Sequence, residues 1–281
     1  RYTEDSLVDG WEFTTHASYM YYDLQAQFNL LPAGTTVPIG PDGNLNQTAP
    51  AGFVTFTEGL IGNPGVETTD AQLDQVALFT GLDNHAIRLA IGTRYQGLEG
   101  RERKNFGPSV IDGTQPIVDG SLTNVSDTDF MFVRNTSRTT KYISLQDQWA
   151  IANNFELTSG VRADHYSDFG STINPRIALV NSQSKLTTKV MYGTAFRAPS
   201  FSEQFNRNNP AVIGNDDLDP ETIDTLEVSF NYKVSQSLNS TINFFQYEAK
   251  DLIEAIPDEG EPTSTTQNAR DQEGRGYEIE V

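Results

Sequence analysis

The sequence predicts an all-β fold, an antiparallel up-and-down β-barrel that crosses a membrane. Two observations support this prediction: apolar and polar side chains alternate over segments of about ten residues, and the connections between these segments are alternately very short and long. Segment 185–197 is the clearest strand, with Val190 and Tyr192 on one face and Lys189 and Arg197 on the other. Alternation over a dozen residues indicates a strand longer than the usual five or six residues.

The same alternation predicts nine further strands, in chain order at 11–28, 70–80, 86–96, 141–151, 155–166, 173–180, 223–234, 238–252 and 276–281. Tight turns are expected at one end of the strands, at 81–85, 152–154, 181–184 and 235–237. The other connections are read as long loops at 29–69, 97–138, 198–222 and 253–270, and only 167–170 breaks the pattern. Short turns at one end and longer loops at the other are typical of membrane β-barrels.

The two faces of the predicted strands fit a wet interior and an apolar exterior. Inward candidates are charged: Arg88, Arg94, Glu156, Arg162, Asp164, Arg176, Lys189 and Arg197. Outward candidates are aliphatic or aromatic, with a girdle at the loop end formed by Tyr95, Tyr166, Tyr192 and Phe196, and with Trp149 and Phe155 at the turn end. Asp147 does not fit, because it shares a face with Leu145 and Trp149. A soluble β-sandwich, with one solvated face per sheet, also alternates and stays open as an alternative.

Composition excludes several classes of partner and chemistry. The formal net charge of −19 argues against a nucleic-acid partner, since phosphate binding requires a basic stripe. The absence of cysteine excludes disulfides, thiolate metal sites and cysteine nucleophiles. No apolar run approaches the roughly 18 residues of a transmembrane helix. The chain starts and stops inside strand-like sequence, and a closed barrel has no edge, so about ten strands are expected to be part of a larger barrel.

Segment 192–222 resembles the barrel of TonB-dependent outer-membrane receptors of Gram-negative bacteria. The residues that carry the resemblance are Tyr192, Gly193, Phe196, Arg197, Ala198, Pro199, Ser200, Asn209, Pro210, Gly214, Asn215, Leu218, Pro220, Glu221 and Thr222. Similar stretches occur at 146–149, 160–164, 167–170, 174–176, 244–247 and 250–253. The resemblance covers 139–281 well and 1–138 mainly in pattern. The motif residues are expected to shape the barrel. Arg197 is expected to form a salt bridge to a carboxylate of the barrel wall or to a group of the plug domain that fills the barrel in this family. Alternatively, Arg197 contacts an anionic ligand.

The resemblance implies a barrel of about 22 strands of the plugged transporter class. In that family an N-terminal plug fills the lumen and a segment ahead of it couples to TonB; the plug, the coupling segment and the closing strands are expected to lie outside this chain. The implied function is import of a scarce, bulky solute from the extracellular loops across the outer membrane, with TonB-supplied energy. A ferric siderophore is the first expectation, and haem, cobalamin or an oligosaccharide are the others. A passive porin-like channel and a soluble secreted β-domain, either glycan-binding or a hydrolase, are the alternative functions.

Candidate ligand contacts are basic residues in or near the predicted long loops, because long loops usually serve recognition. They are Arg101, Arg103, Lys104, Arg134, Arg197 and Arg207. No catalytic residue and no cofactor is indicated: the three histidines are isolated, and no nucleophile elbow, phosphate loop or dinucleotide fingerprint occurs. The loop carboxylates from Asp216 to Glu221 do not follow the EF-hand template, so no metal site is expected.

Overall fold

The computed structural model of the chain describes residues 2–4, 9–41, 43, 50–107, 119–208, 211–260 and 263–281. The long strands are β2 (Trp11–Gln25), β6 (Leu60–Phe79), β7 (His85–Lys104), β9 (Thr136–Ala152), β10 (Phe155–Tyr166), β11 (Gly170–Gln183), β12 (Leu186–Arg197), β14 (Glu221–Lys233), β15 (Asn239–Pro257) and β16 (Ser264–Glu280). The shorter elements are β1 (Tyr2–Glu4), β3 (Phe28–Leu31), β4 (Thr35–Ile39), β5 (Gly52–Phe56), β8 (Thr123–Asn124), the helix α2 (Phe201–Phe205) and β13 (Val212–Ile213).

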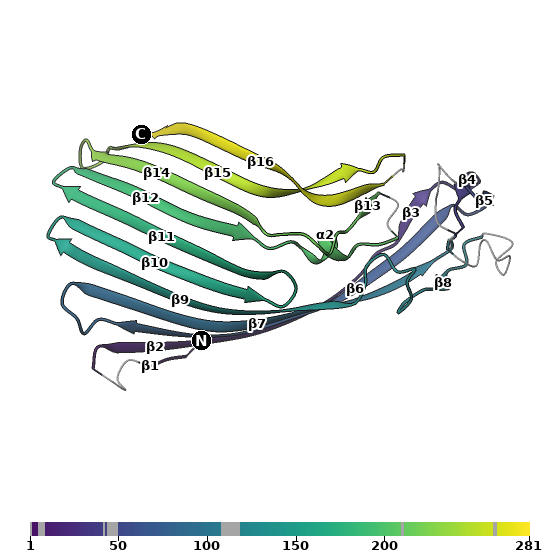
Figure 1. Cartoon of the computed structure of the whole chain (residues 1–281), viewed down its shortest axis with the longest axis horizontal. Coiled ribbons are helices and arrows are strands. Elements are labelled where there is room, and N and C mark those ends of the chain that lie inside the picture. Colours follow the sequence, from purple (N-terminus) through teal and green to yellow (C-terminus); the bar gives the residue numbers. More distant parts are fainter. Residues whose placement is uncertain are drawn as a thin grey trace.

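The long strands form one antiparallel sheet in which each strand lies beside its neighbours in sequence (Figure 1). The strand order is β1-β2-β6-β7-β9-β10-β11-β12-β14-β15-β16-β13, and β4 and β5 form a separate hairpin. The short turns lie together at one end of the curved sheet, which we call the turn end; α2, β13 and the β4–β5 hairpin lie towards the other, the loop end. The predicted up-and-down antiparallel topology is therefore confirmed. Among the described residues β2 and β16 do not pair with each other, so the sheet is an open part of a barrel wall.

Several strands extend further at the loop end than their side-chain pattern predicts. Residues 60–69 and 97–104, which were predicted as loops, complete β6 and β7 and pair with each other. Most of 253–270 is also strand, so the connection between β15 and β16 is short. The alternation signal is missing in these extensions because polar residues occupy both faces. Backbone hydrogen bonds to the neighbouring strand hold them instead.

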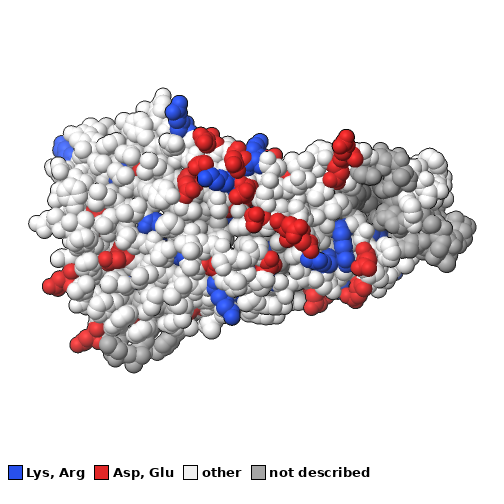
Figure 2. Space-filling view, in the orientation of Figure 1, with Lys and Arg blue, Asp and Glu red and all other residues white. Residues whose placement is uncertain are grey.

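One face of the sheet presents apolar side chains to its surroundings. The exposed fraction is 52% for Leu73, 50% for Ile91 and 53% for Ile143. A β-sandwich would bury such a face against a second sheet, and the described residues contain no second sheet large enough, so the sandwich alternative was wrong. Figure 2 shows one side of the molecule, on which charged side chains gather over the middle and the loop end and are few over the turn-end halves of the strands. We call the apolar side the outward face.

The height of the apolar band matches the hydrocarbon layer of a membrane. His85 and Tyr95 both lie on the outward face of β7, ten residues apart. With a rise of about 3.3 Å per residue and a strand tilt of about 40°, they are separated by roughly 25 Å along the barrel axis. Trp11 and Tyr21 in β2 have the same spacing. Aromatic residues therefore mark both boundaries of the band, as in membrane barrels.

Asp147, which did not fit the outward face, lies at the turn-end boundary of the band. Its Oδ2 is 2.8 Å from Nδ1 of His85, and the His85 ring stacks on Trp149 at a centroid distance of 5.4 Å. A carboxylate is tolerated here because a polar partner accompanies it at the interface rather than in the middle of the apolar band.

Tyr166 was wrongly assigned to the outward girdle. Tyr95 and Tyr192 lie on the outward face, with exposed fractions of 45% and 40%. Alternation along β10 places Tyr166 on the same face as Asp164, and its ring stacks on Phe169 at 4.3 Å. The aromatic character of Tyr166 suggested the girdle, but its position in the alternation decides its face.

Side-chain hydrogen bonds hold the inward face of the wall together. Asp74 is only 8% exposed and accepts hydrogen bonds from Tyr142 Oη at 2.7 Å and from Gln72 Nε2 at 2.7 Å. The Tyr142 ring lies across Gly92 of the strand between them, and the guanidinium of Arg162 stacks on that ring at 3.8 Å. Glycine at position 92 leaves the space that the ring occupies.

A sheet with one membrane-facing side has little core of its own, and a buried apolar cluster lies at its loop end. This cluster consists of Val37, Ile39, Phe56, Leu60 and Phe106, around the β4–β5 hairpin and the loop-end extension of β6. Within the described part of the chain no helix is long and apolar enough to cross a membrane.

Candidate functional site: the loop cluster and a cavity in the wall

Three connections pack together at the loop end and form what we call the loop cluster. It consists of residues 125–134, 166–169, 197–208 and 211–219, from the connections β8–β9, β10–β11 and β12–β14. A bridge between Val133 and Asn206 joins the first connection to the third. The cluster contains seven of the residues that carry the receptor resemblance: Arg197, Ala198, Pro199, Ser200, Gly214, Asn215 and Leu218.

Arg197 fastens the end of β12 to the start of β14. Its Nε is 2.6 Å from Glu221 Oε2, and Glu221 is its register partner across the two strands. Its Nη1 is 2.9 Å from Glu203 Oε2 in α2. One planar guanidinium thus joins two strands and a helix, a geometry that the point charge of a lysine would not reproduce.

A local sequence motif determines where the helix α2 begins. Ser200 caps it by accepting a hydrogen bond from the Glu203 backbone N–H, and the Glu203 side chain accepts one from the Ser200 backbone N–H. This reciprocal capping box requires Ser and Glu three residues apart. Pro199 precedes the cap, where a proline does not interrupt a helix.

Arg138 is the buried centre of the loop cluster. It is 6% exposed, and it donates hydrogen bonds to Asp168 Oδ2 at 2.7 Å, to the Pro199 carbonyl at 2.9 Å and to Gln204 Oε1 at 2.7 Å. The rings of Phe169 and Phe201 lie 5.1 and 5.0 Å from its guanidinium carbon. Arg138 therefore connects β9, the β10–β11 turn and α2. It was missed in the sequence because it lies in a segment without alternation.

Two further arginines connect the β8–β9 and β12–β14 loops at the surface. Arg134 forms an ion pair of 2.6 Å with Asp216 and lies 4.4 Å from the Phe205 ring centroid. Arg207 forms an ion pair of 3.3 Å with Asp129, which is 95% exposed. Exposed pairs of this kind contribute little to stability, about 0–1 kcal/mol each.

The loop cluster also contacts β16. The two residues of β13 pair in parallel with Ser264 and Thr265, and Thr266 Oγ1 donates a hydrogen bond to the Glu203 carbonyl at 2.6 Å. Asn268 Oδ1 accepts one from the Asp219 backbone N–H at 2.9 Å. The long β12–β14 connection is thus anchored at several points.

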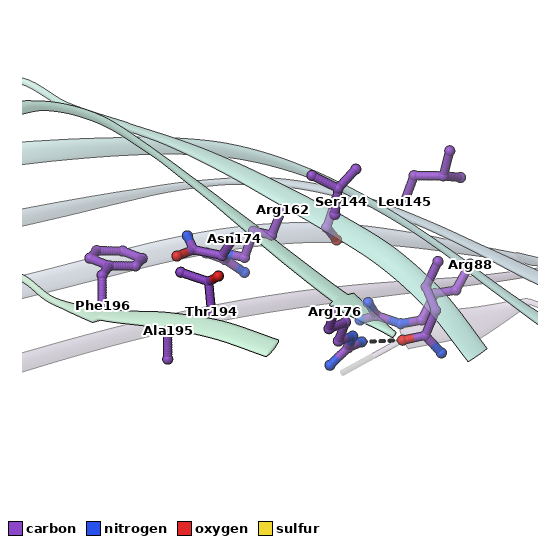
Figure 3. Close-up of a pocket in the computed structure, with 11 residues that line it drawn as sticks. Arg88, Ser144, Leu145, Arg162, Asn174, Arg176, Thr194, Ala195 and Phe196 are labelled. Atoms are coloured by element: carbon purple, nitrogen blue, oxygen red, sulfur yellow. Dashed lines mark hydrogen bonds between the residues drawn. The ribbon is translucent and has the colours of Figure 1, made fainter. Parts of the chain in front are cut away.

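A cavity of about 390 Å³ opens in the wall where β11 and β12 separate (Figure 3). The two strands are paired from Gln183↔Leu186 to Arg176↔Gly193 and no further, whereas β12 stays paired with β14 up to Arg197. Thr194 and Phe196 point towards Asn174 across this separation, and Arg176 points to the other end of the cavity.

Three arginines give the cavity a positive lining. Arg162 forms an ion pair with Asp164 at 2.6 Å, and Arg176 donates a hydrogen bond to Gln146. Arg88 has neither an ion pair nor a hydrogen bond with another described residue. Arginines without carboxylate partners can bind an anionic group, such as a carboxylate or a phenolate.

The structure brings only part of the predicted ligand set together. Arg134, Arg197 and Arg207 belong to the loop cluster. Arg101 and Arg103 lie on the outward face of the β7 extension, where Arg101 pairs with Asp23 and Glu67. Lys104 is fully buried; its Nζ donates to the Phe130 carbonyl and lies 3.6 Å from Glu102.

Other motif residues also contact neighbouring parts of the fold. Leu218 is 2% exposed, and a Cβ on Gly214 would come within 2.7 Å of the Gln204 backbone. Tyr192 Oη donates a hydrogen bond to Asp224 at 2.9 Å. Gly193 lies within β12, at its last pair with β11. Phe196 and Thr222 lie near strand ends, Pro220 directly precedes β14, and Ala198 and Asn215 lie in the loop cluster. Asn209 and Pro210 lie outside the described residues.

Comparison with known proteins shows to which family this barrel wall and its loops belong. The sequence model of the family described as "TonB dependent receptor-like, beta-barrel" matches residues 1–281. The chain belongs to this family. The resemblance seen in the motif segment is thereby confirmed, and the barrel is one of the outer membrane of a Gram-negative bacterium.

Relatives of this TonB-dependent receptor barrel include an iron-regulated outer membrane virulence protein of Vibrio cholerae, 34% identical over 118 residues, which are 40% of this chain and 18% of that protein. The ferric enterobactin receptor of Pseudomonas aeruginosa has the same fold, with a TM-score of 0.63 and 17% identity over 97% of this chain and 39% of that one. The copper transporter OprC gives a TM-score of 0.65 with 14% identity over 99% and 41% of the two chains. The chain thus spans less than half the length of these structures.

Acid is expected to loosen α2. Burial alone would raise the pKa of Glu203, but hydrogen bonds from Arg197 and Ser200 outweigh it and hold that pKa below its ordinary value. A carboxyl group whose pKa is lower in the folded state than in the unfolded state stabilises the folded state at any pH above its unfolded pKa, about 4.3. This contribution is lost as the pH falls through the lower pKa of the folded state.

This predicts that exchange of the Gln204 amide, corrected for its intrinsic rate, is constant from pH 7 to 5 and accelerates below about pH 4. Glu203→Gln is expected to give the faster exchange at every pH. An amide equally protected at pH 7 and pH 3 in the unsubstituted protein would contradict the assignment.

Proposed function

We propose that the protein is an outer-membrane receptor that binds a scarce, bulky solute at its loop end and imports it with energy supplied through TonB. A ferric siderophore is the first candidate; haem, cobalamin and oligosaccharides are the others. Family membership over the whole chain carries the proposal, and the names of the relatives, an iron-regulated outer membrane protein and a ferric enterobactin receptor, favour iron. We further propose that the chain forms ten neighbouring strands of a barrel of about 22, and that the plug and the TonB-coupling segment lie outside these 281 residues.

Of the predicted ligand contacts, Arg134 and Arg207 are the ones we propose to face the solute. Their partners Asp216 and Asp129 are exposed, so exchanging either partner for an anionic ligand group costs little. Lys104 is buried and is proposed to be structural. The positive cavity that includes Arg88 is a second place where an anionic ligand group could bind during passage.

Uptake by cells that express the intact protein tests the proposal. Deletion of the gene is expected to abolish uptake of one radiolabelled ferric siderophore under iron limitation, and the intact gene is expected to restore it only in cells that contain TonB. Arg134→Ala with Arg207→Ala is expected to raise the Kd of that solute roughly tenfold, the effect of losing about 1.4 kcal/mol. Uptake that continues without TonB would indicate a passive channel and would contradict the proposal.

A further inference from the structure

A second cavity, of about 430 Å³, lies on the outward face of the wall, away from the loop cluster. It lies across β2, β6, β7 and β9, and its lining includes Tyr19, Tyr21, Thr69, Tyr95, Glu99 and Ser137. Its position is at the loop-end boundary of the apolar band, since Tyr95 marks that boundary. A ligand in this cavity would therefore be reached from the membrane surface rather than from the lumen.

Strand register shows how the cavity is built. In one row across the strands lie Tyr19, Ala71, Tyr95 and Thr139; in the next lie Tyr21, Thr69, Gly97 and Ser137; in a third lie Asp23, Glu67 and Glu99. The middle row contains a glycine, Gly97, and the Tyr95 ring lies over it: a Cβ on Gly97 would come within 3.1 Å of the Tyr95 hydroxyl. The absence of a side chain at Gly97 thus lets the Tyr95 ring form part of the cavity surface.

Some polar side chains around the cavity already form hydrogen bonds or ion pairs within the protein, and others form none with the described residues. Glu67 is held by Tyr21 Oη at 2.8 Å and by Arg101 Nη1 at 2.9 Å. The side chains of Thr69, Glu99 and Ser137 form no hydrogen bond or ion pair with any other described residue. Two hydroxyls and a carboxylate thus face the cavity with their hydrogen-bonding capacity unused.

This combination matches the chemistry of a sugar. A pyranose has apolar C–H faces that pack on aromatic rings, as the rings of Tyr19, Tyr21 and Tyr95 allow, and hydroxyls that donate to carboxylate and hydroxyl oxygens. A phosphate matches poorly, because Asp23, Glu67 and Glu99 outnumber the single cation Arg101, which two of them already occupy.

We propose that this cavity binds the sugar headgroup of a glycolipid of the outer leaflet, with the tyrosines as stacking surface and Glu99, Thr69 and Ser137 as hydrogen-bond partners. The occupant follows from location: the apolar band below the cavity contacts the acyl chains, and the cavity continues that contact surface at headgroup level. The site is separate from the transport proposal and does not depend on the imported solute.

Lipid titration of the intact, detergent-solubilised protein, read by native mass spectrometry, tests the proposal. The probes are lipopolysaccharide with its core sugars, lipid A without core sugars, and phosphatidylglycerol. We expect the core-bearing lipid to bind with the lowest Kd. Tyr95→Ala, which removes a stacking surface, and Glu99→Gln, which removes the charge from a hydrogen-bond acceptor, are each expected to raise that Kd roughly tenfold.

The matched control is Tyr232→Ala, which removes an equally exposed tyrosine from the outward face near the turn end. It is expected to leave the Kd unchanged. Glu99→Gln hardly alters side-chain shape, so it gives a result even if Tyr95→Ala does not fold. Equal Kd values for unsubstituted protein and Glu99→Gln, or equal binding of lipid A with and without core sugars, would overturn the proposal.

Discussion

Replacing Arg138 by alanine is expected to open the loop cluster. The substitution removes three hydrogen bonds and leaves the largely buried Asp168 carboxylate without its cation. Breaking a buried ion pair by removing one partner costs about 3–5 kcal/mol. Because the contacts of Arg138 lie among loops rather than along the sheet, this loss should appear as local opening of the segment around α2, with the wall intact.

Chymotrypsin cleavage after Phe201 and Phe205 in the intact protein measures that opening. If cleavage follows the open population, a loss of 3–5 kcal/mol accelerates it roughly 10²- to 10⁴-fold. Arg88→Ala is the matched control, since Arg88 has no ion pair or hydrogen bond with another described residue, and it should cleave at the unsubstituted rate. Arg138→Lys should fall between, because it keeps the charge without the planar fork. Equal rates for Arg138→Ala and Arg88→Ala would show that the cluster does not depend on Arg138.

Replacing Gly92 by alanine is expected to weaken the wall itself. A Cβ at this position would lie 2.3 Å from Asp74 Oδ1 and 2.4 Å from the Tyr142 ring. The ring cannot withdraw without giving up its hydrogen bond to Asp74. Overpacking costs about 1–3 kcal/mol and a hydrogen bond to a charged group about 1.5–3 kcal/mol, so a total near 3 kcal/mol is expected.

The measurement is the temperature at which the folded protein in detergent converts to its unfolded form, followed by gel mobility. Gly193→Ala provides the control, because a Cβ there meets nothing closer than 3.7 Å. Gly92→Ala should lower the conversion temperature by several degrees, as expected for about 3 kcal/mol, and Gly193→Ala should leave it unchanged. Similar temperatures for the two variants would mean that Tyr142 can move without cost.

Side-chain alternation predicted the strands wherever one face meets lipid. Segment 155–166 was predicted with the bounds that β10 has, because Leu157 and Val161 alternate with Glu156 and Arg162. Alternation failed in 97–104, because both faces carry polar residues although one of them is buried: Glu102 and Lys104 lie against the β8–β9 connection, whereas Arg101 is exposed. A period of 2 can be seen in the sequence only where the buried or lipid-facing positions are apolar, so it gives no signal where a buried face is polar.

The loop cluster was predictable only where a local motif encodes it. Ser200 and Glu203 form a capping box that their spacing alone indicates, and the motif resemblance pointed to Arg197. Arg138 contacts Asp168 and Gln204, which follow it by 30 and 66 positions, and no local sequence pattern predicts contacts between residues so far apart. The sequence also did not predict the face of the sheet on which Arg101 lies. Its place in the alternation could be counted only once residues 97–104 were known to continue β7.

The wall has a rim of unequal height. β7 continues for nine residues beyond Tyr95, roughly 30 Å along the strand, whereas β10 turns back at Tyr166. The low side is bordered by the β12–β14 connection, which Arg138 joins to the β10–β11 turn. The described part of the rim is therefore high on the β6–β7 side and low on the β10–β11 side. Under the proposed function, a large solute would reach the loop cluster more easily over the β10–β11 side.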